Sequence, residues 1–227
     1  GTANTAVGFE AARNSTTATN NTAIGFCALR TNTTGASNAA FGIYALNANT
    51  TASDNTALGA AALYANTTGT SNTAVGRRSL ETNTTGADNT AVGVCALCSN
   101  TTASFNTAVG RNSLRCNTTG ASNTTLGYAT MYTNTTGCCN TAIGDTALGA
   151  NTTASFNTAV GFRALCANTT GASNVAMGYK SSQANTTGEK NTAVGTNALS
   201  ANETGTQNVA VGHAALIASI LQPNRIK

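Results

Sequence analysis

Charged side chains are scarce in this 227-residue chain. Asp, Glu, Lys and Arg make up 8% of it, whereas an ordinary soluble domain contains roughly 25%. The net charge of +4 is also dispersed, because Arg77-Arg78 is the only adjacent basic pair in the sequence. Nucleic acids are bound chiefly by clusters of Lys and Arg, so we expect no nucleic-acid partner.

The residues that carry most enzyme chemistry are equally sparse. The chain has one His, His213, and seven acidic residues, of which only Glu81 and Asp88 share one of the repeats described below. Neither a pair of catalytic carboxylates nor a Ser-His-Asp arrangement can be assembled from so few groups. We therefore expect no catalytic residues, no cofactor and no enzymatic activity.

Long hydrophobic runs are missing too. No stretch approaches the ~18 apolar residues needed to cross a bilayer, so we expect no membrane span. The sequence has neither a starting Met nor a signal-peptide pattern, which suggests a mature chain or a fragment of a longer one.

What the chain does have is a strict 17-residue repeat. An Asn opens each unit from Asn4 to Asn208 without insertion or deletion, which gives thirteen units, the last incomplete. We number the positions of each unit from this Asn, so that residues 72–88, NTAVGRRSLETNTTGAD, are positions 1 to 17. Position 4 is always apolar, positions 3 and 8 are small, and position 9 is usually Leu. Position 5 holds the predicted turn glycines, which are Gly8, Gly25, Gly42, Gly59, Gly76, Gly93, Gly110, Gly127, Gly144, Gly161, Gly178, Gly195 and Gly212.

The length and composition of the unit indicate the fold. Seventeen residues are too few for a helix pair, whose repeats have about 33 to 47 residues, and Thr, Asn and Gly are poor in helix interiors. We therefore predict an all-β fold, a β-solenoid or β-roll with one coil per unit and about thirteen coils. Each coil should contain two or three short extended segments joined at Gly-marked turns. The solenoid is expected to span residues 1–216, with residues 217–227 as a C-terminal cap or connecting tail.

The apolar neighbours at positions 3 and 4 predict self-association. Consecutive residues of a strand point to opposite faces, so one member of a pair such as Ala74-Val75 fills the coil and the other faces outward. An outward apolar residue in every coil forms a ridge too large to leave in water. We expect further copies of the chain to cover it, as a parallel trimer or an end-to-end fibre. The alternative is that Ala at position 3 is the outward residue and is simply tolerated there.

The repeat also resembles a known family. The pattern NTAVGxxALxxNTTG, with apolar-Gly pairs such as Val75-Gly76 and Val92-Gly93, resembles the YadA-like head repeats of trimeric autotransporter adhesins. It is also similar to the stalk repeats of tail-fibre proteins that end in an endosialidase-type chaperone. The resemblance covers residues 1–216 and implies a parallel β-roll, assembled as a trimer, with a role in projection and adhesion.

Position 12 repeats a glycosylation pattern. Asn-X-Thr is the acceptor sequence for N-linked glycans, and it persists where the middle residue changes, in Asn202-Glu203-Thr204. The alternative is a corner whose Asn side chains stack into a hydrogen-bonded ladder. Both interpretations stay open from the sequence. The candidate glycosylation sites are Asn32, Asn49, Asn66, Asn83, Asn100, Asn117, Asn134, Asn151, Asn168, Asn185 and Asn202.

The seven cysteines form no ladder along the repeat. Cys95 and Cys98 have a metal-ligand spacing, but no second pair or His lies near them in the sequence, so we expect no metal site. Cys98 and Cys116 fall at neighbouring positions of adjacent coils, which makes them the best internal disulfide candidate. Cys138-Cys139 lie at a coil-to-coil connection, where links between protomers are conceivable, and several others are expected to be small apolar substitutes for Ala or Ser.

These observations favour a structural role over a catalytic one. The main hypothesis is a fibre or adhesin shaft, extracellular or on a cell or virion surface, with or without covalent glycans. A phage or viral tail-fibre shaft that binds a cell-surface receptor is the alternative. A third hypothesis is an ice-binding solenoid with a Thr array, but positions 13 and 14 are adjacent and should point in opposite directions.

Overall fold

The computed structural model describes residues 1–217, and it is all-β within that range. It forms two compact units, which divide between Asn112 and Ser113. The first unit contains β1 (Thr5–Val7), β2 (Thr22–Ile24), β3 (Ala39–Phe41), β4 (Thr56–Leu58), β5 (Thr73–Val75), β6 (Thr90–Val92) and β7 (Thr107–Val109). The second contains β8 (Thr124–Leu126), β9 (Thr141–Ile143), β10 (Thr158–Val160), β11 (Val175–Met177), β12 (Thr192–Val194) and β13 (Val209–Val211).

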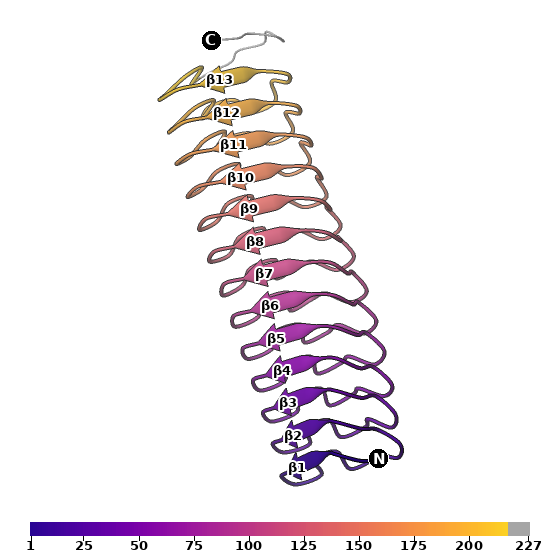
Figure 1. The fold of residues 1–227 in the computed structure, drawn as a ribbon. Helices are drawn as coiled ribbons and strands as arrows, with labels where there is room; N and C mark the ends of the chain where they lie inside the picture. The colour runs from indigo at the N-terminus through magenta and orange to yellow at the C-terminus, as the bar shows by residue number, and fades with distance from the viewer. Residues whose placement is uncertain (218–227) are drawn as a thin grey trace. The chain divides into compact units, whose positions relative to one another are not determined.

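Within each unit the strands are parallel and follow the chain order, one strand per coil (Figure 1). Each strand residue pairs with the residue at the same position of the next repeat, so that Thr73 pairs with Thr90, Ala74 with Ala91 and Val75 with Val92. A β-solenoid with 17-residue coils is therefore the fold, as the periodicity predicts. The coil contains one three-residue strand at positions 2 to 4 rather than two or three extended segments, and most of the remainder is turn.

Hydrogen bonds between coils nevertheless continue through the turns. The N–H of Leu29 donates to the carbonyl of Ala45 in the next coil at 2.9 Å, and the N–H of Cys27 donates to Phe9 of the preceding coil at 2.9 Å. Successive coils are thus joined along most of their circumference. One extra residue in a repeat would shift all later donors away from their acceptors. This explains why no 17-residue repeat has gained or lost a residue.

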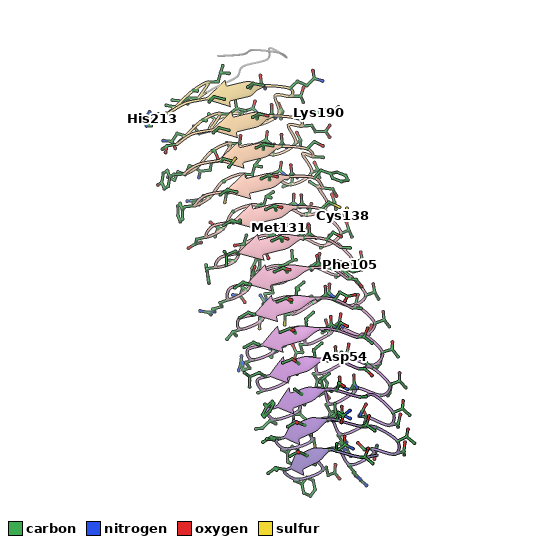
Figure 2. All side chains as sticks on the ribbon, in the orientation of Figure 1. Asp54, Phe105, Met131, Cys138, Lys190 and His213 are labelled. Atoms are coloured by element: carbon green, nitrogen blue, oxygen red, sulfur yellow. The ribbon has the colours of Figure 1, made fainter. Side chains whose placement is uncertain are left out.

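A thin apolar column fills the coils. Ala at position 3, Ala or Ser at position 8 and Leu at position 9 are almost all fully buried, as in Ala91, Ala96 and Leu97. Met131 occupies the Leu position in its coil and is equally buried (Figure 2). One member of each position 3–4 pair therefore does fill the interior. The alternative in which Ala at position 3 faces water is wrong, because Ala is the inward residue and position 4 the outward one.

The Gly at position 5 lies close to the backbone of the next coil. Its φ is 125° to 140° in all thirteen coils, a conformation that side chains rarely adopt. A Cβ on Gly93 would also stand 2.6 Å from the carbonyl carbon and oxygen of Gly110 in the next coil. Backbone conformation and space both require Gly at this position.

The turns also use non-glycine residues in the left-handed region. Positions 7, 9 and 17 have φ between 46° and 62° in the described coils, including Leu97 and Asp88. Asn and Asp accept this conformation readily, whereas Leu adopts it at a steric cost. At position 9 that cost is offset by full burial of the Leu side chain.

The C-terminal boundary of the solenoid is only partly described. The carbonyl of Ile217 accepts a 2.7 Å hydrogen bond from Ala201, so the coil pattern reaches this residue. The expected cap or tail, residues 217–227, otherwise lies outside the described residues. No helix capable of crossing a bilayer occurs among residues 1–217.

Candidate interaction surface

The Asn of position 12 is a structural element of the coil. The Asn83 Nδ2 donates to the Asn66 Oδ1 of the preceding coil at 2.9 Å and to the Gly86 carbonyl at 2.9 Å. The same two bonds recur in other coils of both compact units. For example, the Asn151 Nδ2 donates to the Asn134 Oδ1 and to the Ala154 carbonyl. A second ladder runs through position 1, where the N–H of Asn72 donates to the Asn55 Oδ1 at 3.0 Å. Hydrogen-bonded amide columns therefore join the coils from inside.

This ladder bears directly on the predicted glycosylation. All eleven candidate asparagines, from Asn32 to Asn202, are at most 1% exposed. A glycan is attached at Nδ2, the atom that makes both ladder bonds, and a buried amide has no room for it. Of the two interpretations left open by the sequence, the geometry therefore supports the corner ladder. The first coil differs. Its Asn-X-Thr sequence begins one position earlier, at Asn14, and the Asn14 side chain is exposed.

The paired threonines of positions 13 and 14 have different environments. The Thr84 hydroxyl, at position 13, donates to the carbonyl of Thr101 in the next coil at 3.0 Å, and equivalent bonds recur in both units. The neighbouring Thr85, at position 14, is exposed. The two side chains thus do point apart, and only one hydroxyl per pair faces solvent. The pairs do not form the two-abreast Thr ranks that the ice-binding hypothesis requires.

The outward strand face, which we define as the side chains of positions 2 and 4, carries many of the exposed apolar residues. Position 4 is apolar in every coil although the coil interior does not contain it, and Val7, Leu58 and Val211 are 57%, 49% and 59% exposed. Position 2, mostly Thr, lies on the same side because it is two residues away. The outward strand face therefore carries an apolar residue in each of the thirteen coils.

Aromatic residues extend this surface in the first coils. Phe9 stacks on Phe26 with ring centroids 5.3 Å apart, Phe26 meets Tyr44 edge-on at 5.4 Å, and Tyr44 meets Tyr64 at 6.1 Å. Ile43, which lies beside Tyr44 in sequence, is 53% exposed. These rings follow positions 6, 7 and 10 rather than a single column. Sequence reasoning missed the cluster because it compared equal positions of successive repeats.

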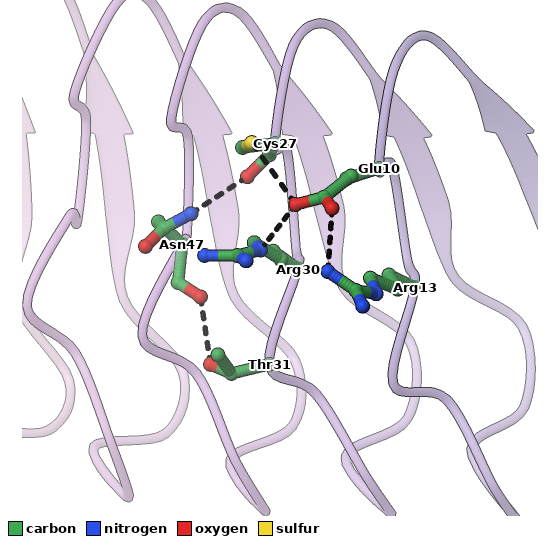
Figure 3. A network of polar contacts seen from close by, with 6 residues as sticks. All are labelled: Glu10, Arg13, Cys27, Arg30, Thr31 and Asn47. Carbon is green, nitrogen blue, oxygen red and sulfur yellow. Dashed lines mark hydrogen bonds and ion pairs between the residues drawn. The ribbon is translucent and has the colours of Figure 1, made fainter.

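Charged groups near this cluster are paired with one another. Glu10 forms ion pairs with Arg13 in its own coil and with Arg30 in the next, and the Cys27 thiol lies 3.8 Å from its carboxylate (Figure 3). The Arg13 and Arg30 side chains are 55% and 40% exposed, so these pairs add little stability. Glu10 is thus held between two guanidinium groups on the coil surface.

The cysteines are all free thiols, so the predicted Cys98–Cys116 disulfide is wrong. Cys98 is buried and faces Cys95 and Glu81 instead, with 3.5 Å between its sulfur and the Glu81 carboxylate. Burial, the neighbouring Cys95 and the Glu81 carboxylate raise the pKa of the Cys98 thiol to about 12. Cys139 is exposed, and a hydrogen bond with the Cys138 thiol raises its pKa.

These environments predict an order of thiol reactivity. In the native chain a neutral maleimide should label the exposed Cys139 first, whereas the buried Cys27, Cys95 and Cys98 should react at least about 100-fold more slowly, because burial blocks access to all three and the thiolate of Cys98 is also disfavoured. Peptide mapping over time gives the individual rates, and labelling in urea provides the control in which all seven react. Equal rates for Cys98 and Cys139 in the native chain would contradict the buried placement.

No group of three or more potential metal ligands occurs within residues 1–217. The sites that sequence reasoning singled out thus become inward scaffold residues, while the outward surface is apolar and hydroxyl-rich. Comparison of the chain with protein families, with curated proteins and with solved structures finds no match. The structure itself therefore identifies the chain as a tandem-repeat β-solenoid.

Proposed function

We propose that this chain is a non-catalytic structural module, the shaft of an extracellular fibre or adhesin, which assembles with further copies through its outward strand face. The proposal rests mainly on the apolar residue at position 4 of all thirteen coils, which faces away from the core. The resemblance to adhesin head and tail-fibre stalk repeats supports the same role. The fold supplies length and regularity without any cluster suited to chemistry among the described residues.

In the proposed assembly the favourable free energy comes from burial of the outward side chains. Burying apolar surface contributes roughly 25 cal/mol per Å², and a stable interface needs about 800 Å² from each partner. A column of partly exposed Val, Ile, Leu, Phe and Met, repeated from coil to coil, offers apolar surface to such an interface without any change of backbone. Its neighbour at position 2, usually Thr, is small enough to let two such faces approach.

The self-association proposal is tested by placing charge on the outward strand face. The variant Val75→Lys with Val92→Lys should remain folded, because both side chains point outward, but should sediment as a 22.5 kDa monomer. The control, Ser37→Lys with Ser71→Lys, adds equal charge at position 17, where Lys190 stands naturally. Sedimentation velocity should show the wild type and the control as larger assemblies. A monomeric wild type at about 50 μM, well above typical Kd values for such interfaces, would refute the proposal.

A further inference from the structure

One exposed column of the solenoid does not vary. Position 14 is Thr in all twelve coils that contain it, and each of these side chains is exposed. The other exposed positions vary widely; position 17, for example, holds Asn, Ser, Asp, Phe, Cys, Lys and Gln. The column comprises Thr17, Thr34, Thr51, Thr68, Thr85, Thr102, Thr119, Thr136, Thr153, Thr170, Thr187 and Thr204.

The fold does not account for this constancy. At position 13 the hydroxyl has a structural role, because it donates to the next coil, and at position 12 the buried amide joins neighbouring coils. At position 14 only the backbone takes part, as in the 3.2 Å bond from the Thr68 N–H to the Thr84 carbonyl. No hydroxyl of the column forms a hydrogen bond within the described residues. Position 13 even changes to Glu203 while Thr204 follows unchanged.

The surroundings of the column leave room for a bulky group. Position 15 is Gly or Ala, and position 16 is mostly Ala, Ser or Thr. Most of the large exposed apolar side chains lie at positions 4, 6 and 7, on the outward strand face and the turn after it, while Phe105 and Phe156 are exposed at position 17, three residues after the column. In the second unit, Figure 2 shows this separation, with Lys190 and Cys138 on one side and His213 of position 6 on the other. The threonine corner is thus followed directly by small residues, with Phe at position 17 in two coils only, and is distinct from the proposed interface.

We propose that the hydroxyls of position 14 are attachment sites for O-linked saccharides. In the reaction a Thr Oγ1 attacks the anomeric carbon of a nucleotide-activated sugar in the active site of a glycosyltransferase. The Oγ1–carbon bond forms, the bond from the sugar to the diphosphate breaks, and the hydroxyl proton passes to a base of the transferase. The nucleoside diphosphate leaves, so atoms and charge balance.

A neutral sugar suits the column better than phosphate does. Coils of a parallel sheet lie about 4.8 Å apart, so phosphates on successive coils would place like charges at that spacing. Neutral pyranose rings can stack at nearly this distance without repulsion. The saccharides would hydrate the corner opposite the apolar face, and so direct association to that face.

The test is site-resolved mass spectrometry of the full chain purified from the cells that make it. Electron-transfer fragmentation should place hexose-type mass increments on position 14, for example on Thr68 and Thr85, and none on Thr67, Thr84 or Asn83. The variant Thr85→Val, which keeps the branched shape, should lose one increment and retain the fold. Ser71→Ala, which removes an exposed hydroxyl at position 17, is the matched control and should lose none.

Other outcomes overturn the inference. A bare position 14, phosphate on these hydroxyls, or sugars confined to the asparagines would each contradict it. The result is independent of the proposed fibre role, because sedimentation of unmodified recombinant chain tests self-association separately. A chain that assembles but carries no sugar would refute only the modification.

Discussion

Replacing Gly144 by Ala is expected to destabilise its coil by at least about 3 kcal/mol. Gly144 has a φ of 125°, and a Cβ there would lie 2.6 Å from the carbonyl carbon and oxygen of Gly161 in the next coil. Neither contact can be relieved without separating two hydrogen-bonded coils. The urea midpoint of the variant, measured by circular dichroism, should fall accordingly.

The same coil provides the control. At Gly149 an added Cβ would find its nearest atom, the carbonyl oxygen of Thr146, at 3.1 Å, and this glycine has no left-handed φ. Gly149→Ala should therefore change the urea midpoint by much less than Gly144→Ala. If the two substitutions were equally harmful, the close approach of coils at position 5 would not be the cause.

Replacing Asn83 by Asp should have a comparable effect, with a distinctive pH dependence. The Asn83 Nδ2 faces two acceptors, the Asn66 Oδ1 and the Gly86 carbonyl, both at 2.9 Å. An ionised Asp would present a buried carboxylate to these oxygens, at a cost of about 4 kcal/mol near pH 7. Thermal unfolding of the variant and the wild type across pH measures this loss.

The pH dependence follows from the protonation states. Burial beside two acceptors raises the pKa of the carboxyl introduced by Asn83→Asp above its unfolded value of about 3.9. The folded state then binds a proton that the unfolded state has released, so stability declines as pH rises above about 4 until the folded pKa is passed. The defect should shrink in acid, where the neutral carboxyl can donate one bond.

A matched substitution separates this effect from a general change of charge. Asn20→Asp alters an exposed residue at position 17, where Asp54 and Asp88 stand in other coils. It should leave both stability and its pH dependence close to wild type. A pH-independent loss in the Asn83→Asp variant would instead indicate that the ladder contributes shape rather than donors.

The fold was predictable because the residue types at fixed positions of the repeat indicate where each coil turns and which side chains are buried. Gly at position 5, Leu at position 9 and the unbroken spacing predict coils, a core column and close backbone contact, and these are what the structure contains. The left-handed conformation of residues such as Leu97 was not predictable, because Leu has no local preference for it. It arises from the closure of the turn and the burial of the side chain, which are tertiary effects.

The candidate site was harder to predict, because outward and inward residues are both apolar here. The pair Ala74-Val75 gives no indication which member is inside until the coil is built. The Asn-X-Thr pattern was ambiguous for a related reason: an amide ladder and a glycosylation acceptor can use the same residues. Burial of Asn83 distinguishes them, and burial is not encoded in the pattern alone. The aromatic contacts of Phe26 and Tyr44 cross repeat positions, so periodicity could not reveal them.

The amide ladders have an evolutionary consequence. Each Asn donates to the coil before it and accepts from the coil after it, as Asn66 does between Asn49 and Asn83. Every coil therefore presents the same donors on one side and the same acceptors on the other. Duplication or deletion of the gene segment that encodes one whole coil preserves all these matches, whereas insertion or deletion of a single codon breaks them. The length of such a protein can consequently vary between generations in whole steps, by unequal recombination within its own gene, while the cross-section remains under strict selection.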